Sequence, residues 1–240
     1  LQLPGPSIDN LKGRLQADRQ NLAFNGSAHL YGGSSQGSFV VTNTQPLSYQ
    51  INQQATGINI LPLLEDAFAY SSLTGNGNAA FNLNAQGRNR QEIIASLNGI
   101  LQLRIQNGAW LGMDLNHVLA DSRQNIRYDR TNRTPFDHFT LNSRIIDGIG
   151  RHQNAELRSN QVHMLSNGST DLKRSILKES LIISNPQSNA APIPLRIEGP
   201  VANPSITIDY PSLTRGLSTP EEKQKIIGDT LKQQWNWLSR

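Results

Sequence analysis

Short runs of alternating apolar and polar residues recur along the chain. Between residues 100 and 106, Leu101, Leu103 and Ile105 would share one face, while the positions between them are Gln or Arg. Alternation with a period of two is typical of a β-strand that buries one face. Similar runs contain the apolar residues Leu22, Phe24, Ala28, Leu30, Phe39, Val41, Phe81, Leu83, Ile193, Leu195, Ile197, Ile206 and Ile208. The pattern predicts strands with one apolar face and one polar face rich in Asn, Gln, Ser and Arg.

Glycine-containing dipeptides separate or interrupt these runs. Asn-Gly stands at residues 25–26, 76–77, 98–99, 107–108 and 167–168, and Asp-Gly stands at 147–148. Because Asn and Gly tolerate a positive φ, such pairs favour the tight turns of β-hairpins. We therefore expect these six pairs to be turns in a mainly β fold with antiparallel strands.

Three short segments have the apolar spacing of helices. They are residues 58–70, 90–97 and 114–122. Helices of this length are not stable alone in water, so each is expected to pack against the sheet.

The C-terminal segment has the features of a longer amphipathic helix. Thr219 can cap the helix N-terminus, Pro220 suits the first helical position, and Glu222 can face back toward the cap. Beyond them, one apolar stripe would be formed by Ile227, Leu231, Trp235 and Leu238. Such a stripe, with lysines beside it, predicts an amphipathic helix.

These features divide the chain into three parts. We expect residues 1–210 to form a β-domain, residues 211–218 to be a linker, and residues 219–240 to form the amphipathic helix. That helix would either cap the exposed sheet edge or contact a membrane or a partner through Trp235 and Trp237.

The composition favours a thin sheet over a thick core. Hydrophobic residues make up 36% of the 240 residues and charged residues 17%, whereas globular domains usually have about 45–50% and about 25%. The difference is made up by neutral polar residues, including 24 Asn and 19 Gln. The chain has no cysteine, which excludes disulfides and thiolate chemistry. The net charge of +4 is too small to indicate a nucleic-acid partner.

No segment has the features of a signal sequence or of a membrane-spanning helix. There is no apolar run of about 18 residues, and the chain begins without Met. We expect the chain to be a fragment of a longer protein, separated from its targeting segment.

No motif of an enzyme stands out, so we predict neither catalysis nor a cofactor. None of the five histidines has the spacing of a metal motif. Asp114, His117 and Asp121 would form an exposed row on a helix rather than a metal site. His152 and Glu156 have the spacing of an ordinary helix pair. A basic cluster of Arg123, Arg127, Arg130 and Arg133 around Tyr128 is expected to be a solvated loop, with contact to anionic lipid headgroups as the alternative.

Several segments built around glycine and leucine follow one another between residues 22 and 209. They include Leu30-Tyr31-Gly32-Gly33, Ile58-Asn59-Ile60-Leu61-Pro62-Leu63-Leu64, Leu73-Thr74-Gly75-Asn76-Gly77, Leu97-Asn98-Gly99, Asn107-Gly108-Ala109, Gly112-Met113-Asp114-Leu115, Ile146-Asp147-Gly148 and Ile193-Pro194. In this order and spacing, they resemble the C-terminal, periplasmic part of AsmA-like proteins of Gram-negative bacteria, the group that also contains TamB.

The resemblance implies a curved, mostly antiparallel sheet, folded like a taco or gutter, with an apolar inner face. It also implies a periplasmic protein that is anchored in the inner membrane by an N-terminal helix, which this chain lacks. Members of the family are implicated in outer-membrane biogenesis and in carrying phospholipid between membranes, and they look like eukaryotic bridge-like lipid-transfer proteins.

The predicted site is a groove in which phospholipid acyl chains lie on the apolar sheet face. Its candidate lining residues are Phe24, Phe39, Val41, Phe81, Leu83, Leu101, Leu103 and Ile105. One alternative is that the sheet and helices close on each other and leave a dry core. A second is a structural or assembly factor that binds outer-membrane proteins through a sheet edge or the terminal helix. A third, an adhesin or glycan-binding domain, is disfavoured by the 6% aromatic content.

Overall fold

In the computed structural model, which describes residues 8–120, 128–213, 224, 225 and 228, the chain forms one antiparallel sheet. The sheet has 12 strands, and each strand pairs with the next strand in the sequence. The strands are β1 (Ile8–Ala17), β2 (Asn21–Leu30), β3 (Gly33–Thr42), β4 (Ser48–Asn59), β5 (Leu73–Gln86), β6 (Asn98–Leu111), β7 (Arg133–Ile146), β8 (Ile149–Arg158), β9 (His163–Asp171), β10 (Ile176–Ser184), β11 (Ile193–Pro200) and β12 (Ser205–Ile208). The expectation of a mainly β fold is confirmed.

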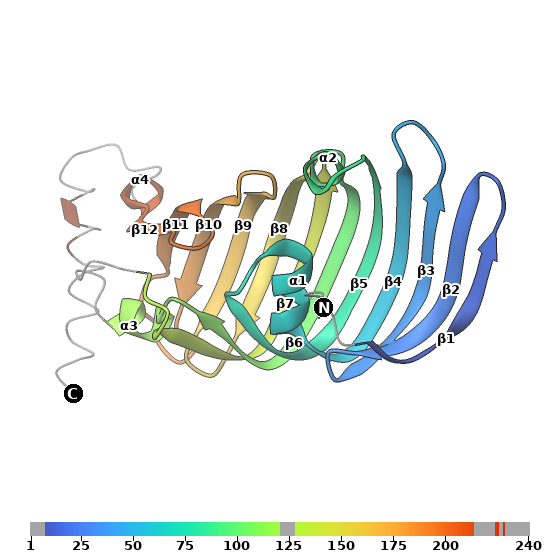
Figure 1. The fold of residues 1–240 in the computed structure, drawn as a ribbon. Coiled ribbons are helices and arrows are strands. Elements are labelled where there is room, and N and C mark those ends of the chain that lie inside the picture. The colour runs from blue at the N-terminus through green and yellow to red at the C-terminus, as the bar shows by residue number, and fades with distance from the viewer. Residues whose placement is uncertain (1–7, 121–127, 214–223, 226–227, 229–240) are drawn as a thin grey trace.

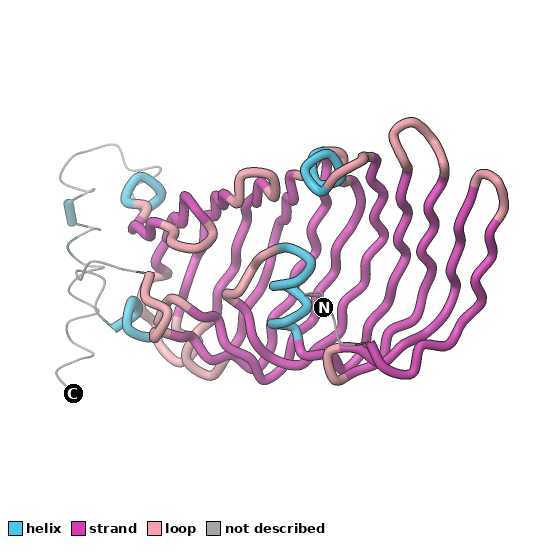
Figure 2. The backbone as a smooth tube through the Cα atoms, viewed as in Figure 1, coloured by secondary structure: helices cyan, strands magenta, loops and turns pink. Residues whose placement is uncertain are grey.

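The sheet is bent into an open trough (Figures 1 and 2). Its strands curve around a concave face, and helix α1 (Ile60–Phe68) lies within that concavity. The first and last strands do not pair, so the sheet is not closed. The gutter shape implied by the family resemblance is therefore also confirmed.

The Asn-Gly pairs do not behave as expected. All five lie inside strands, in β2, β5, β6 and β9, so the prediction that they are hairpin turns is wrong. Glycine is needed there because the backbones crowd: a Cβ at Gly77 would lie 2.1 Å from the Arg104 carbonyl oxygen. Asn107, with φ 51°, instead lies in a bulge of β6 opposite β5. Glycines and bulges inside long strands are the usual cause of bends in a sheet.

The Asp-Gly pair does form a turn. Asp147 and Gly148 join β7 to β8, and their φ angles are 49° and 73°. Positive φ at both central residues is what a two-residue type I′ hairpin requires, and Asp-Gly meets this requirement at low cost.

The strand register places one apolar face along the whole sheet. Residues that lie opposite each other on neighbouring antiparallel strands point to the same side. One row of such neighbours runs through Leu15, Phe24, Phe39, Ile51, Leu83, Gly99, Ile145, Gly150, Thr170 and Leu177. Helix α1 packs on this same side, which makes it the concave face.

The three short helices form where the spacing predicted them. α1 buries Ile60, Leu63 and Leu64, and α2 (Arg90–Ala95) begins at Asn89, whose side chain accepts a hydrogen bond from the Glu92 backbone N–H. α3 (Leu115–Ala120) buries Leu115 and Val118 against the sheet. A further short helix, α4 (Tyr210–Leu213), follows β12. As expected, α1, α2 and α3 all lie against strands.

Burial is uneven along the sheet. Among the described side chains of residues 9–42, only Ala28 and Ser35 are buried. The large, fully buried side chains lie instead between β4 and β11, for example Leu157, Ile183 and Ile193. The core is therefore thick toward the C-terminal strands, while strands β1 to β3 form a single uncovered layer.

Some expectations fall outside the described residues. These are the amphipathic helix with Trp235 and Trp237, most of the linker, Asp121, Arg123 and Arg127. One prediction is wrong: His152 and Glu156 lie in β8, not in a helix. A bulge between His152 and Ala155 puts the two side chains on different faces of the sheet. His152 pairs with Glu179, and Glu156 pairs with His163.

Candidate functional site

Exposed apolar side chains cover the concave face of the first four strands. The exposed fraction is 64% for Leu15, 43% for Leu22, 37% for Phe39 and 36% for Ile51. The partly buried Phe24 and Val41 lie between them in the same cross-strand rows. We call these six residues the open floor. Contiguous apolar surface of this kind is uncommon on a soluble protein and marks a binding surface.

A row of glycines lies next to the open floor. Gly13, Gly26 and Gly37 lie opposite one another on β1, β2 and β3. The Phe24 ring lies across the first two, since a Cβ at Gly13 or Gly26 would come within 2.7 Å of its Cζ atom. The missing side chains at Gly13 and Gly26 make room for the Phe24 ring, which covers this part of the floor with apolar surface.

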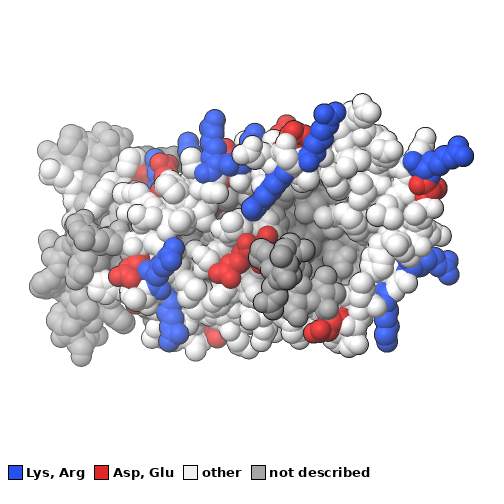
Figure 3. All heavy atoms as spheres, in the orientation of Figure 1, with Lys and Arg blue, Asp and Glu red and all other residues white. Residues whose placement is uncertain are grey.

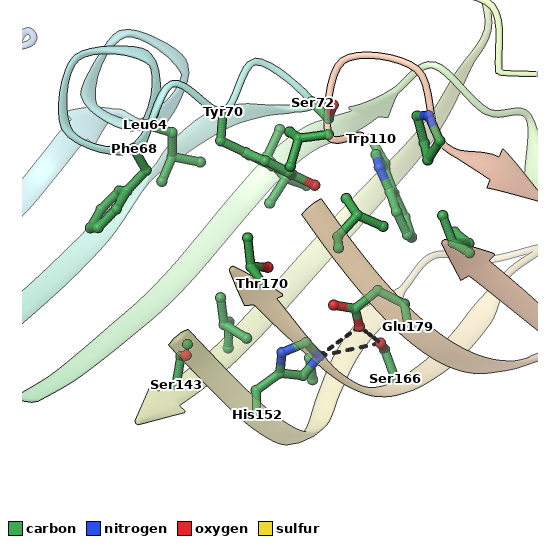
Figure 4. Close-up of a pocket in the computed structure, with 18 of the residues that line it drawn as sticks. Leu64, Phe68, Tyr70, Ser72, Trp110, Ser143, His152, Ser166, Thr170 and Glu179 are labelled. Atoms are coloured by element: carbon green, nitrogen blue, oxygen red, sulfur yellow. Dashed lines mark hydrogen bonds and ion pairs between the residues drawn. The ribbon is translucent and has the colours of Figure 1, made fainter. Parts of the chain in front are cut away.

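Farther along the same face, the trough is partly roofed and holds a cavity of about 160 Å³. Its floor includes Leu101, Leu103 and Ile145 from the sheet. The roof consists of side chains from α1, from the segment that follows α1, from the end of β6 and from the segments before and after α3. They are Leu64, Phe68, Tyr70, Ser72, Trp110, Met113 and Tyr128. Figure 4 shows several of these residues facing the sheet across the cavity. Most of the lining is apolar.

Helix α1 separates the open floor from the cavity. Its Phe68 packs on Phe81 of β5, with the ring centroids 6.4 Å apart. The Tyr31 hydroxyl, in the turn between β2 and β3, donates a 2.8 Å hydrogen bond to Asp66 Oδ2 of the helix. Burial, together with this hydrogen bond, raises the pKa of Tyr31 above its ordinary value. The contact ties the helix to the hairpin beneath it.

Three polar side chains interrupt the apolar floor of the cavity. Glu179 Oε2 lies 3.0 Å from His152 Nε2 and accepts a 2.8 Å hydrogen bond from the Ser166 hydroxyl. His152 Nε2 is also 3.3 Å from the Ser166 oxygen. We call these three residues the polar cluster. The side chains of His152 and Glu179 are only 11% and 12% exposed.

The register explains why the polar cluster forms. His152 on β8 and Glu179 on β10 both lie opposite Gly168 on β9, the strand between them. A Cβ at position 168 would lie 2.2 Å from Glu179 Oε2, so the absent side chain leaves the space that the carboxylate occupies. Glycine at this position therefore lets two side chains from alternate strands meet.

Polar groups on the roof face the same space. The hydroxyl oxygens of Ser72 and Tyr128 are 3.4 Å apart. Burial raises the pKa of Tyr70, and the negative charge of Glu179 raises it further. Figure 4 shows Tyr70 and Trp110 on the opposite side of the cavity from the polar cluster.

All eight predicted lining residues lie on the concave face, but in two different settings. Phe24, Phe39, Val41 and Phe81 keep some exposure to solvent. The other four are buried, with exposed fractions between 1% and 8%: Leu83, Leu101, Leu103 and Ile105. Of these four, Leu101 and Leu103 line the cavity. The site is thus open at its N-terminal end and covered over the remaining strands.

The sequence analysis missed several residues of the site. Leu15 and Ile51 belong to the open floor, and the cavity contains Tyr70, Trp110, Tyr128, His152 and Glu179. Glu179 could have been noticed in the sequence. It occupies an inward position of β10 between Leu177 and Leu181, where the alternation predicts an apolar residue. Nothing in the sequence linked Tyr128 or Trp110 to the same cavity.

Neither a metal-binding cluster nor a membrane-spanning helix occurs among the described residues. Within the described part of the chain, no group of three or more His, Cys, Asp or Glu side chains could hold a metal ion. In the same residues, no helix has the length and apolarity needed to cross a membrane. Figure 3 shows that most of the described surface on the concave side carries no charge.

Comparison with known proteins gives one match. The model of the AsmA family matches residues 1–155. No curated protein and no solved structure matches the chain. The matched range includes the open floor, α1 and His152, and it ends within β8, before Ser166 and Glu179.

Proposed function

Since the chain belongs to the AsmA family, we propose that it holds the acyl chains of phospholipids on its concave face while they move between envelope membranes. Membership of this family supports a function in the bacterial envelope and its outer membrane in general. The finer proposal is a periplasmic protein, anchored in the inner membrane, that shelters lipid without catalysing a reaction.

The observation that carries the proposal is the open floor. Leu15, Leu22, Phe39 and Ile51 keep between 36% and 64% of their surface exposed on the concave face. Each methylene group that such a surface removes from water contributes about 0.8 kcal/mol, so a lipid chain can be held by apolar contact alone.

The dimensions of the trough fit an extended acyl chain. The row from Leu15 to Leu83 crosses five strands, which corresponds to about 19 Å at the usual spacing between strands. Strands β1, β2 and β3 have 10 residues each, which corresponds to about 33 Å. The row continues from Leu83 through Gly99 to Ile145 in the roofed part of the trough.

A double substitution on the open floor tests this proposal. Leu15→Asp combined with Phe39→Asp puts two charges where acyl chains would lie, and both positions are exposed enough for the fold to tolerate the change. We expect the purified variant to carry about tenfold less phospholipid, measured by mass spectrometry of an organic extract. Leu103 is unsuitable for this purpose, because it is 2% exposed and a charge there would disrupt the core.

Val40→Asp is the matched control for that experiment. Val40 is adjacent to Phe39 on β3 but points to the convex face, where it lies opposite Ala23 and Gln50. We expect this variant to keep its lipid. Lipid-free wild-type protein, or equal lipid loss in the control and the double variant, would contradict the proposal.

A second candidate function follows from strand β1. All described side chains of β1 beyond Ile8 are exposed, and within the described chain the strand pairs only with β2. An unpaired strand edge can bind another chain by adding a strand to the sheet. A structural or assembly factor for outer-membrane proteins would use this edge. In that case the purified chain would carry no lipid, and a photo-crosslinker at position 11 would attach it to an envelope protein.

A further inference from the structure

The roofed part of the trough contains the ion pair of Glu179 and His152. Among the described residues that line the cavity, Glu179 is the one carboxylate, and none is Lys or Arg. His152 Nε2 lies 3.0 Å from Oε2 of this carboxylate, and the imidazole is positively charged only when it is protonated. Both contacts of the carboxylate are made to Oε2, and no hydrogen bond to Oε1 occurs among the described residues.

Oε1 of Glu179 is not sealed off, since no buried side-chain oxygen among the described residues lacks a hydrogen-bond partner, and a cation or a hydrogen-bond donor can therefore approach it. A phosphate group would find no Lys or Arg among the described residues of this lining, and the Glu179 carboxylate would repel it. An ammonium group fits better, since it can donate hydrogen bonds to the free oxygen. The aromatic rings of Tyr70, Trp110 and Tyr128 line the same cavity and can also attract a cation through their faces.

We propose that the polar cluster is a subsite for the ammonium group of a lipid headgroup. This inference rests on the proposed function, and it specifies the class of lipid: one with a primary amine, whose acyl chains extend along the trough. The cavity of about 160 Å³ is smaller than a typical pocket for a drug-sized ligand, about 300–1,000 Å³, and suits a small headgroup.

The continuity of the floor supports this arrangement. The row that contains His152 and Glu179 includes Phe81, Leu101 and Ser143. The polar cluster and Phe81, on which α1 packs, therefore lie on one face of the sheet, and an amphiphile that reaches both the open floor and the cluster follows this face past the helix.

The test compares two lipids with identical short acyl chains, phosphatidylethanolamine and phosphatidylglycerol, each below its micelle-forming concentration. Binding to the purified chain is measured by calorimetry. We expect phosphatidylethanolamine to bind about tenfold more tightly than phosphatidylglycerol, the difference expected for one charge-assisted hydrogen bond.

Glu179→Gln should abolish this preference, so that the two lipids bind with equal affinity, because glutamine keeps the size and the acceptor but removes the charge. The matched control is Glu156→Gln. Glu156 forms the same type of pair with His163, at 2.8 Å, and lies between the buried Ala155 and Leu157, which puts it on the convex face. This control should keep the wild-type preference.

The outcomes separate the two proposals. Equal binding of both lipids by the wild-type chain would overturn the ammonium subsite and leave the acyl-chain proposal standing. A preference that survives Glu179→Gln would overturn the role of the polar cluster. Failure of the wild-type chain to bind either lipid would overturn the proposed function, and this inference with it.

Discussion

At the scale of single residues, exposure separates side chains that share the concave face. Phe39 and Leu103 both point inward from their strands, but their exposed fractions are 37% and 2%. The difference arises because α1 and the segment after it roof the trough from β5 onward, while nothing among the described residues covers β1 to β3 to the same degree. Phe39 is thus available to a ligand, and Leu103 contributes to stability.

At the C-terminal end of the sheet, Asp209 makes two side-chain hydrogen bonds that should make folding stability depend on pH. Its Oδ2 accepts a 2.6 Å hydrogen bond from the Ser212 hydroxyl and a 3.0 Å hydrogen bond from Arg196 Nη2. The Ser212 hydrogen bond and the Arg196 guanidinium hold the pKa of Asp209 below its ordinary value. The ionised carboxylate therefore binds its partners in the folded state more strongly than the protonated form does.

We expect Asp209→Asn to lower the free energy of unfolding by about 1 kcal/mol at pH 7, measured by urea denaturation. The pKa is lowered on folding, so this contribution is fully present above the unfolded pKa of about 3.9 and is lost as the pH falls through the folded pKa. The difference between wild type and variant should therefore shrink below about pH 4. A difference that stays constant down to about pH 2 would show that the charge of Asp209 is not involved.

The individual residues of the site could be predicted only in part from the sequence. Alternation identified the inward faces of β2, β3, β5 and β6, because the period of two reports directly which side of a strand a residue occupies. It could not find the polar cluster, because His152 and Glu179 meet only through the register of three strands and the small size of Gly168.

At the scale of elements, α1 is the part that roofs the trough. It has nine residues, and its own Leu63 and Leu64 are buried against the sheet. The hydrogen bond from Tyr31 to Asp66 connects it to the hairpin of β2 and β3, so it is held at both its buried face and its outer surface.

Removing that hydrogen bond should loosen the helix. We expect Tyr31→Phe to cost about 0.5–1 kcal/mol, because the contact is exposed, and to increase amide hydrogen exchange in Ile60–Phe68. Exchange in β9 and β10 should be unaffected. Unchanged exchange in the helix would mean that its apolar face alone fixes its position.

The type of each element was easier to predict than its detailed role. The helices were found because apolar residues with helical spacing stand out against alternating strands, although Ile58 belongs to β4 rather than to α1. The Asn-Gly pairs misled because the same positive φ serves a bulge as well as a turn, as at Asn107. Only tertiary contacts, such as that between Gly77 and the Arg104 backbone, decide between the two.

At the scale of the whole molecule, the central feature is a sheet that is covered at one end and bare at the other. Strand order follows sequence order throughout, so each strand finds its partner locally and the trough can extend strand by strand. The low apolar content indicated a sheet with too little material to cover it. Where the cover would lie could not be predicted, because it depends on how far the bent sheet brings α1 and Tyr128 over the strands.

The most direct test of the account is a photo-crosslinking phenylalanine analogue placed at position 39, with the same analogue at position 40 as the control for the opposite face. After illumination in living cells, mass spectrometry identifies what is attached to each variant. The account predicts phospholipid attached at position 39 and none at position 40. Equal attachment at both positions, or only protein attached at position 39, would contradict it.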